Sequence, residues 1–439
     1  MLANESKERY LTAFNQLRVN LADRSPPWLN DLRNAGVTRF ETLGFPTAKV
    51  EEWRFTNVEP LVSQSFAPAN GEAASVRAEE IIPWSLAEPD APRLVFVNGV
   101  YTPQLSRVPA LPKGVVIGSL AASIDRDDEI VASQLGHYVD LERQHFAALN
   151  TAFLQDGALV SIGAGCRLQQ PIYLVFVSTV LHQPVISQPR TLILLGAGCE
   201  AKIVESYLGA NDGRYFCNAV SELIGGADAV VEHYRLQQER DTGYHIGTLA
   251  ARLERGCHFT AHAVTLSGGF VRNNVHVVLG GEGAECELNG LYLADGKQHV
   301  DNFTEIAHSK PRARSLELYK GILSGDAHGV FNGKIVVHKD AQKSDARQTN
   351  KNLLLSGNAV VHTKPQLEIN ADDVKCSHGS TIGQLDADAM FYLRTRGLGP
   401  EEARSLLSFA FASDVVGRMR IDALRSQLDA YLVARFGKG

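Results

Sequence analysis

Hydrophobic and polar positions divide the chain into three zones with different periodicity. In the first zone, apolar residues recur at three- and four-residue steps over 5–22 and 138–154, which is the spacing of one helix face. The apolar run Arg93–Val97 between these segments has the length and composition of a strand. We therefore expect a mixed, mainly helical N-terminal domain over residues 1–155.

The middle zone, residues 156–385, alternates strand-like segments with glycine turns. The turns recur about every 30 residues, a period typical of stacked repeats. They lie at Gly163/Gly165, Gly196/Gly198, Gly225/Gly226, Gly256 and Gly281/Gly283. No long helical pattern interrupts this zone, which leaves a β-sandwich or a solenoid. The regular spacing favours a solenoid of the parallel β-helix type.

The third zone, residues 386–439, returns to a helical pattern. Gly399-Pro400-Glu401-Glu402 has the features of a helix start, because proline fits the first turn and acidic residues suit the positive end of the helix dipole. A last helix is predicted from the apolar stripe between Ile421 and Phe436. The whole pattern predicts a mainly β protein, with a central β-helix between helical N-terminal and C-terminal domains.

Composition and charge narrow the possible partners and compartments. Hydrophobic residues make up 44% and charged residues 21% of the chain, as in ordinary globular proteins. The net charge of −6 offers no global polycation to nucleic acid. The most apolar stretch, Ile172–Leu181, is about half the length that spans a membrane, and the mixed charges of the first residues do not resemble a secretory signal. We expect a cytoplasmic protein with free thiols and with neither nucleic-acid nor membrane partners.

Motifs of self-sufficient enzymes are missing from the sequence. Gly329–Lys334 only approximates a P-loop, because Ile335 stands where serine or threonine would follow the lysine. The sequence also contains no Gly-x-Ser-x-Gly, His-Glu-x-x-His or Cys-x-x-Cys motif. We therefore expect a non-catalytic protein. The alternative is a β-helix enzyme that acts on polysaccharide, which would require a pair of carboxylates that the strands do not obviously supply.

Five of the six cysteines have an ordinary structural interpretation. Three of them directly follow a turn glycine at equivalent positions of the repeats, and two lie in strand-like segments. These residues are Cys166, Cys199, Cys257, Cys217 and Cys286. Cysteine commonly acts as a small buried side chain in such places, so we assign these five no chemical role.

Cys376 differs because its neighbours are polar, and His378 follows two positions later. In an extended strand both side chains point to the same face, so they could bind one metal ion or neighbouring irons of one cluster. Lys375 is expected to lower the pKa of the thiol. Two ligands do not complete a site. Two interpretations remain open: an exposed polar turn without metal, or half of a site whose other ligands come from another chain.

The first of the two C-terminal helices carries more apolar surface than one buried stripe requires. Leu406 and Phe409 lie on one face, whereas Leu407, Phe411 and Val415 lie on an adjoining one. Again two interpretations remain open. The helix is either fully buried between the last helix and the solenoid, or its second face docks into a groove on a partner.

Motifs spread over 329–397 together resemble the SufB/SufD family of iron–sulfur cluster assembly proteins. They are Gly329–His338, Ala341–Ala346, Asn350–Ser356, Lys364–Ile369, Val374–Gly379, Gln384–Asp386 and Phe391–Gly397. Near the N-terminus, Lys49–Asn57 is similar to the SufD branch in particular. The family's fold, a right-handed parallel β-helix flanked by helical domains, agrees with the periodicity described above.

The resemblance implies a scaffold rather than an enzyme. A SufD-like chain would pair with a SufB-like paralogue, and each would bind one copy of the ABC-type ATPase SufC. A transient iron–sulfur cluster would form at the interface between the paralogues, with none firmly bound by this chain alone. The resemblance matches His378 to a ligand at that interface, and Cys376 to the nearby cysteine.

The family's use of its C-terminal helical domain to bind SufC favours the docking interpretation for the face formed by Leu407, Phe411 and Val415. A remaining alternative is a homodimer, in which this chain would act as a scaffold without a SufB-like partner.

Overall fold

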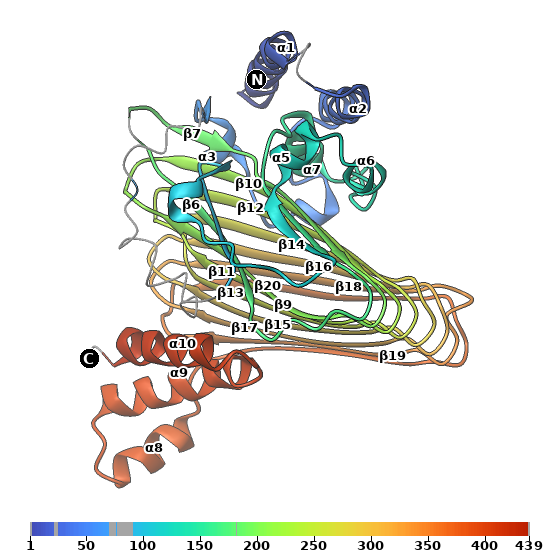
Figure 1. Cartoon of the computed structure of the whole chain (residues 1–439). Helices are drawn as coiled ribbons and strands as arrows, with labels where there is room; N and C mark the ends of the chain where they lie inside the picture. Colours follow the sequence, from blue (N-terminus) through green and yellow to red (C-terminus); the bar gives the residue numbers. More distant parts are fainter. Residues whose placement is uncertain (1, 22–24, 70–75, 77–90, 181, 438–439) are drawn as a thin grey trace.

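A parallel β-helix forms the centre of the molecule, with helices at both of its sides (Figure 1). The computed structural model describes residues 2–21, 25–69, 76, 91–180 and 182–437. The predicted fold class is therefore confirmed. None of the helices within these ranges is long and apolar enough to cross a membrane.

The N-terminal region contributes helices and the first strands of both sheets. Its elements are α1 (Leu2–Leu21), α2 (Pro27–Leu43), η1 (Glu51–Trp53), α3 (Glu59–Val62), β1 (Ala67–Pro68), β2 (Arg93–Val97), β3 (Val100–Tyr101), η2 (Pro103–Leu105), β4 (Val115–Ser119), α5 (Leu120–Asp125), α6 (Glu129–Gln134) and α7 (His145–Ala152). The helix predicted over 138–154 is thus shorter than expected. The backbone N–H groups of Gly136 and Tyr138 donate to the carboxylate of Glu222, which holds this segment in a non-helical conformation.

The β-helix consists of two sheets whose strands alternate along the chain. One sheet has the order β20-β18-β16-β14-β12-β10-β8-β5-β4, and the other has the order β21-β19-β17-β15-β13-β11-β9-β6-β2-β3. Within the solenoid, each long strand pairs in parallel with the strand two places further along the chain.

The strands of the solenoid are mostly ten residues long in its second half. They are β5 (Ala158–Ile162), β6 (Ile172–Ser178), β7 (Val185–Ser187), β8 (Arg190–Leu195), β9 (Glu200–Gly209), β10 (Tyr215–Gly225), β11 (Val230–Gln238), β12 (Gly243–Leu253), β13 (His258–Ser267), β14 (Phe270–Leu279), β15 (Glu285–Ala294), β16 (His299–His308), β17 (Arg314–Leu323), β18 (His328–Val337), β19 (Asp345–Leu354), β20 (Val360–Ile369) and β21 (Lys375–Gly383).

The glycine turns form a corner of the solenoid. Gly198 and Gly256 adopt φ values of 64° and 62°, a left-handed conformation that other residues adopt only at a cost. The cysteine after each of them, Cys199 or Cys257, is buried in the core between the sheets. Burial raises the pKa of the Cys199 thiol to about 11 and that of Cys257 to about 12, so both are unreactive thiols. The structural interpretation of these cysteines is confirmed.

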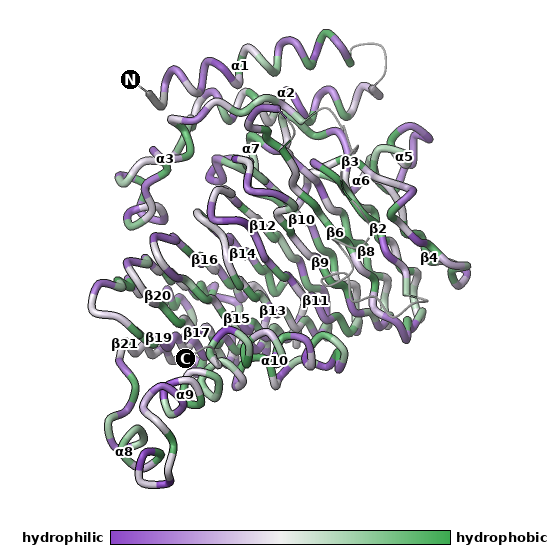
Figure 2. The backbone as a smooth tube through the Cα atoms, turned by 90° about the vertical axis from the view of Figure 1, so that its left-hand side faces the viewer, coloured by the Kyte–Doolittle hydropathy of each residue, from purple (hydrophilic) through white to green (hydrophobic). Residues whose placement is uncertain are grey.

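Three helices follow the solenoid: α8 (Ala387–Thr395), α9 (Pro400–Val416) and α10 (Asp422–Phe436). The predicted helices correspond to α9 and α10, whereas α8 was not predicted. Helix α9 packs on the outer face of β15 and β17, and α8 extends away from the body (Figure 2). The predicted domain boundary at 155/156 falls between α7 and β5, and the one at 385/386 falls between β21 and α8.

Candidate functional site

The last turn of the solenoid is open on one side. Strands β20 and β21 end their respective sheets, and within the described residues neither has a strand on its outer edge. The side chains of both strands are exposed or half-buried, whereas those of the preceding turns are largely buried. An edge of this kind presents unpaired backbone N–H and C=O groups and is a template for pairing with another chain.

Cys376 and His378 both point toward the inside of this open turn. Cys376 lies next to Ala346 in the register, and His378 lies next to Gln348. Ala346 and Gln348 are buried in the interior, and Cys376 packs against the same apolar cluster as Ala346. The segment is a strand, β21, rather than a turn, so the predicted common orientation of the two side chains is correct.

The two side chains differ in accessibility. Cys376 is half-buried, and burial raises the pKa of its thiol above the ordinary value, with Asp345 adding to the effect. The prediction that Lys375 lowers this pKa is therefore wrong, because Lys375 alternates to the outer face of the strand and is exposed. His378 is exposed.

These two residues cannot complete a metal site by themselves. No group of three or more histidine, cysteine, aspartate or glutamate side chains is placed to hold a metal ion anywhere in the described part of the chain. A tetrahedral iron centre needs four ligands. Any cluster at Cys376 and His378 would therefore take its other ligands from outside these residues.

The segment that contains η1 contacts β20, one of the two strands of the open turn. The sequence did not predict this contact. Glu51 forms an ion pair with Lys364 on β20, and Phe55 stacks on His362 with ring centroids 4.3 Å apart. Further back, the guanidinium of Arg272 lies 3.8 Å from the ring centroid of Trp53. The segment that resembles SufD is thus fixed against the edge of the open turn.

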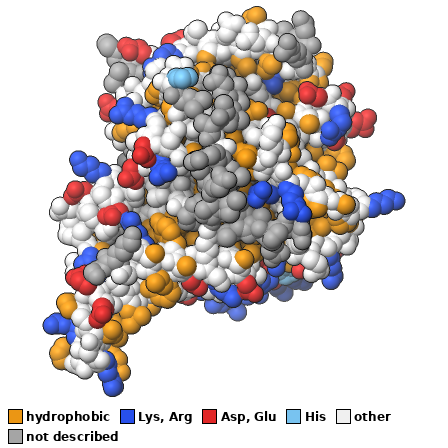
Figure 3. Space-filling model, turned by 60° about the vertical axis from the view of Figure 1, so that its left-hand side comes forward, with side chains coloured by type: hydrophobic (Ala, Val, Ile, Leu, Met, Phe, Trp, Pro, Cys, Tyr) orange, Lys and Arg blue, Asp and Glu red, His pale blue; other side chains and the backbone are white. Residues whose placement is uncertain are grey.

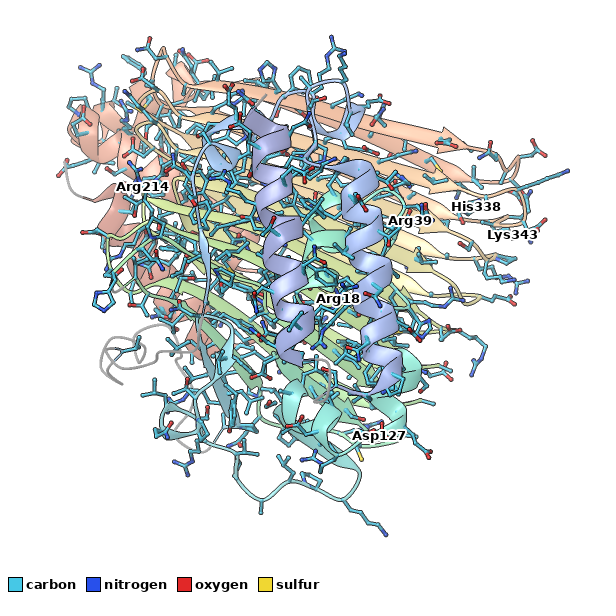
Figure 4. All side chains as sticks on the ribbon, turned by 90° about the horizontal axis from the view of Figure 1, so that it is seen from above. Arg18, Arg39, Asp127, Arg214, His338 and Lys343 are labelled. Atoms are coloured by element: carbon cyan, nitrogen blue, oxygen red, sulfur yellow. The ribbon has the colours of Figure 1, made fainter. Side chains whose placement is uncertain are left out.

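The other histidines form no metal-binding group within the described residues, although His299, His328 and His362 lie next to one another on β16, β18 and β20. His262 on β13 is buried and stacks on Tyr234, with ring centroids 4.9 Å apart. Burial lowers the pKa of His262 to about 4, so its ring is neutral at pH 7. His338 lies in the exposed turn between β18 and β19, at the projecting edge of the solenoid together with Lys343 (Figure 4).

A second surface feature lies on the C-terminal helices. Leu406 and Phe409 of α9, with Val433 and Phe436 of α10, line a groove of about 440 Å³. Leu406 is 46% exposed. Figure 3 shows hydrophobic side chains gathered on this projecting part of the molecule, at the lower left.

The adjoining face of α9 points toward the solenoid. Val415 is completely buried. The ammonium nitrogen of Lys320 on β17 lies 4.5 Å from the centroid of the Phe411 ring. Leu407 is half-buried. The expectation that the Leu407, Phe411 and Val415 face is free for a partner therefore needs correction, because the solenoid occupies it. Leu406 is the exposed apolar residue of α9, and Phe409, which is half-buried and packs against the same cluster as Phe411, lines the groove beside it.

Comparison with known proteins gives consistent results over nearly the whole chain. Residues 177–411 match the SufBD core domain of SUF system FeS cluster assembly, and residues 4–174 match the SufBD protein N-terminal region. An iron–sulfur cluster assembly SufBD family protein of Synechocystis is 36% identical over 90% of this chain and 88% of its own length. Iron–sulfur cluster assembly protein SufD of Escherichia coli is 31% identical over 90% of both chains. The SufD protein of Bacillus subtilis is 25% identical over 96% of both.

Proposed function

Since this chain belongs to the SufB/SufD family of iron–sulfur cluster assembly proteins, we propose that it is the SufD-type scaffold subunit of a larger complex. It pairs through its last solenoid turn with a SufB-like paralogue, and a transient cluster forms between the two. The observation that carries this proposal is the open turn itself, where two unpaired edges and an incomplete ligand pair lie together. A second copy of a related solenoid could continue both sheets across such edges.

The incomplete ligand set suits transient assembly. A cluster held partly by the His378 imidazole has fewer thiolate ligands than one in a four-cysteine cage, and it is easier to pass to an acceptor protein. A site divided between two chains also opens when the chains move apart. On this proposal the chain is not an enzyme, and the cluster is its cargo rather than a resident cofactor.

The groove on α9 and α10 is the proposed docking surface for the ATPase SufC. Apolar side chains that face solvent on neighbouring helices fit the mode in which one helix of a partner fills a groove. Leu406 and Phe409 line it from α9. The ATPase would then contact the C-terminal helices, whereas the paralogue would contact the edges of β20 and β21.

Two reciprocal variants test both surfaces in one experiment. Ile382 on β21 is 48% exposed and belongs to the proposed paralogue interface. Ile382→Lys is expected to weaken binding of the SufB-like subunit at least about tenfold, because a lysine ammonium would be buried there without a partner. Leu406→Asp is expected to weaken binding of the ATPase by a similar factor, because an aspartate carboxylate would be buried in that interface without a partner. Affinity and complex mass are measured after co-expression, by light scattering and titration.

Each variant serves as the control for the other. Ile382→Lys should retain the ATPase, and Leu406→Asp should retain the paralogue. Val19→Asp on the distant helix α1, where Val19 is 69% exposed, should retain both. Unchanged binding of both partners by either variant contradicts the corresponding surface. A homodimer that persists in the presence of the paralogue would favour the self-pairing alternative.

A further inference from the structure

A column of three polar side chains leads from the core of the solenoid to the open turn. Glu317 on β17, Gln348 on β19 and His378 on β21 occupy the same register position of neighbouring strands. The residue before them in the column, Leu288 on β15, is apolar and buried. Glu317 and Gln348 are also buried, whereas His378 is exposed. Buried polar groups therefore extend inward behind the histidine, as buried Asn350 does behind Ser380 in the next inward-facing column.

Only one of the two polar atoms of the Gln348 amide forms a hydrogen bond within the described residues. Its Nε2 donates a hydrogen bond to Oε2 of Glu317 at 2.7 Å. Its Oε1 is buried and has no hydrogen-bond partner among the described residues. Because a buried acceptor without a donor costs free energy, such an atom calls for an explanation. The amide orientation follows from Glu317, which accepts from the NH₂ group and so leaves Oε1 as the free acceptor.

The facing sheet is adapted to this amide. A Cβ atom on Gly333 of β18 would lie 2.2 Å from Nε2 of Gln348, which is much too close. With any larger residue at this position, the glutamine amide would have to shift from its place beside Glu317. Burial raises the pKa of Glu317 to about 7, so the column carries less than a full negative charge at neutral pH.

We propose that Gln348 is a positioning residue for His378. When a partner covers the open turn, one ring N–H of His378 donates to Oε1 of Gln348, and the other ring nitrogen is left to bind iron. Histidines that bind metals almost always donate their second ring N–H to a carbonyl or carboxylate oxygen. Gln348 is the neighbour of His378 in the ladder and has the free acceptor for it. This inference rests on the proposed function of His378 as a ligand.

The test uses the complex of full-length chains, loaded with cluster under anaerobic conditions and reduced to a paramagnetic state. Pulsed EPR separates the nitrogen of a histidine that binds iron from the remote ring nitrogen, whose quadrupole coupling depends on its hydrogen bond. In the Gln348→Met complex we expect the directly bound nitrogen to remain and the remote coupling to change. Cluster release to a chelator should accelerate about 10- to 100-fold.

The control is Thr363→Val, which removes a hydroxyl from β20 in the facing sheet of the same open turn. This variant should leave both the spectrum and the release rate unchanged. An unchanged remote coupling in Gln348→Met, with His378 shown to bind iron, overturns the inference alone. If His378→Ala leaves the nitrogen signals of the unmodified complex intact, the proposed role of His378 fails instead.

Discussion

Replacing His378 with alanine is expected to reduce cluster assembly by the complex about tenfold or more, because loss of a ligand should cost at least as much as the roughly 10- to 100-fold loss caused by removing a ligand's hydrogen-bond partner. The fold and the binding of both partners should be unaffected. His378 is exposed on the last strand, so removal of its ring leaves no cavity in a packed core. The measurement is the amount of cluster formed per complex from iron and sulfide, with the thermal unfolding midpoint recorded in parallel.

The matched control is Ser380→Ala, two residues further along the same face of β21. Ser380 shares the exposure and the strand of His378 but has no side chain that binds iron well. The complex with Ser380→Ala should assemble cluster at the normal level. Assembly at the normal level by the His378→Ala complex would remove this residue from the site.

Replacing Arg190 with methionine is expected to lower the free energy of unfolding by about 3–5 kcal/mol, because it leaves the buried carboxylate of Glu222 without its counter-ion. Both side chains are fully buried. Nε and Nη2 of Arg190 donate to the same oxygen of Glu222 at 3.0 and 2.7 Å. Nη1 donates to Asn150 and Thr151 of α7. The pair therefore joins the N-terminal helices to the start of the solenoid.

Urea denaturation of the isolated chain measures this effect. Arg255→Met is the control, because Arg255 forms an ion pair with Asp228 in which both side chains are more than half exposed. An exposed pair contributes about 1 kcal/mol or less. The double variant Arg190→Met, Glu222→Gln should recover part of the loss, since no charge is then left unpaired. A loss at Arg190 no larger than that at Arg255 would contradict the assigned role.

The repeat of the solenoid could be predicted because its corners have a strict local requirement. A residue with positive φ lies at each of these corners, and glycine supplies it at Gly198 and Gly256, whereas Asp228, Arg312 and Lys343 adopt it at other corners. The spacing of these glycines therefore marks the turns of the β-helix. Helix α8 was missed because its nine residues, Ala387–Thr395, are fewer than the window over which a helical periodicity can be recognised.

The site could be predicted only in part. The common orientation of Cys376 and His378 follows from their spacing once the segment is a strand, but the sequence left a strand and a polar turn both open, and the structure shows the strand. Contacts that join distant segments, such as Glu51 with Lys364 or Gln348 with Glu317, depend on how the turns stack. The sequence also shows two apolar faces on α9, but only tertiary packing determines which of them the solenoid covers.

Anaerobic reconstitution with iron and sulfide tests the central claim most directly, by comparing the isolated chain with its complex with a SufB-like subunit. Mössbauer and absorption spectra measure the cluster bound by each after gel filtration. We expect cluster on the complex and little or none on the isolated chain, because Cys376 and His378 supply too few ligands. A stable cluster with four ligands from this chain alone would contradict the account.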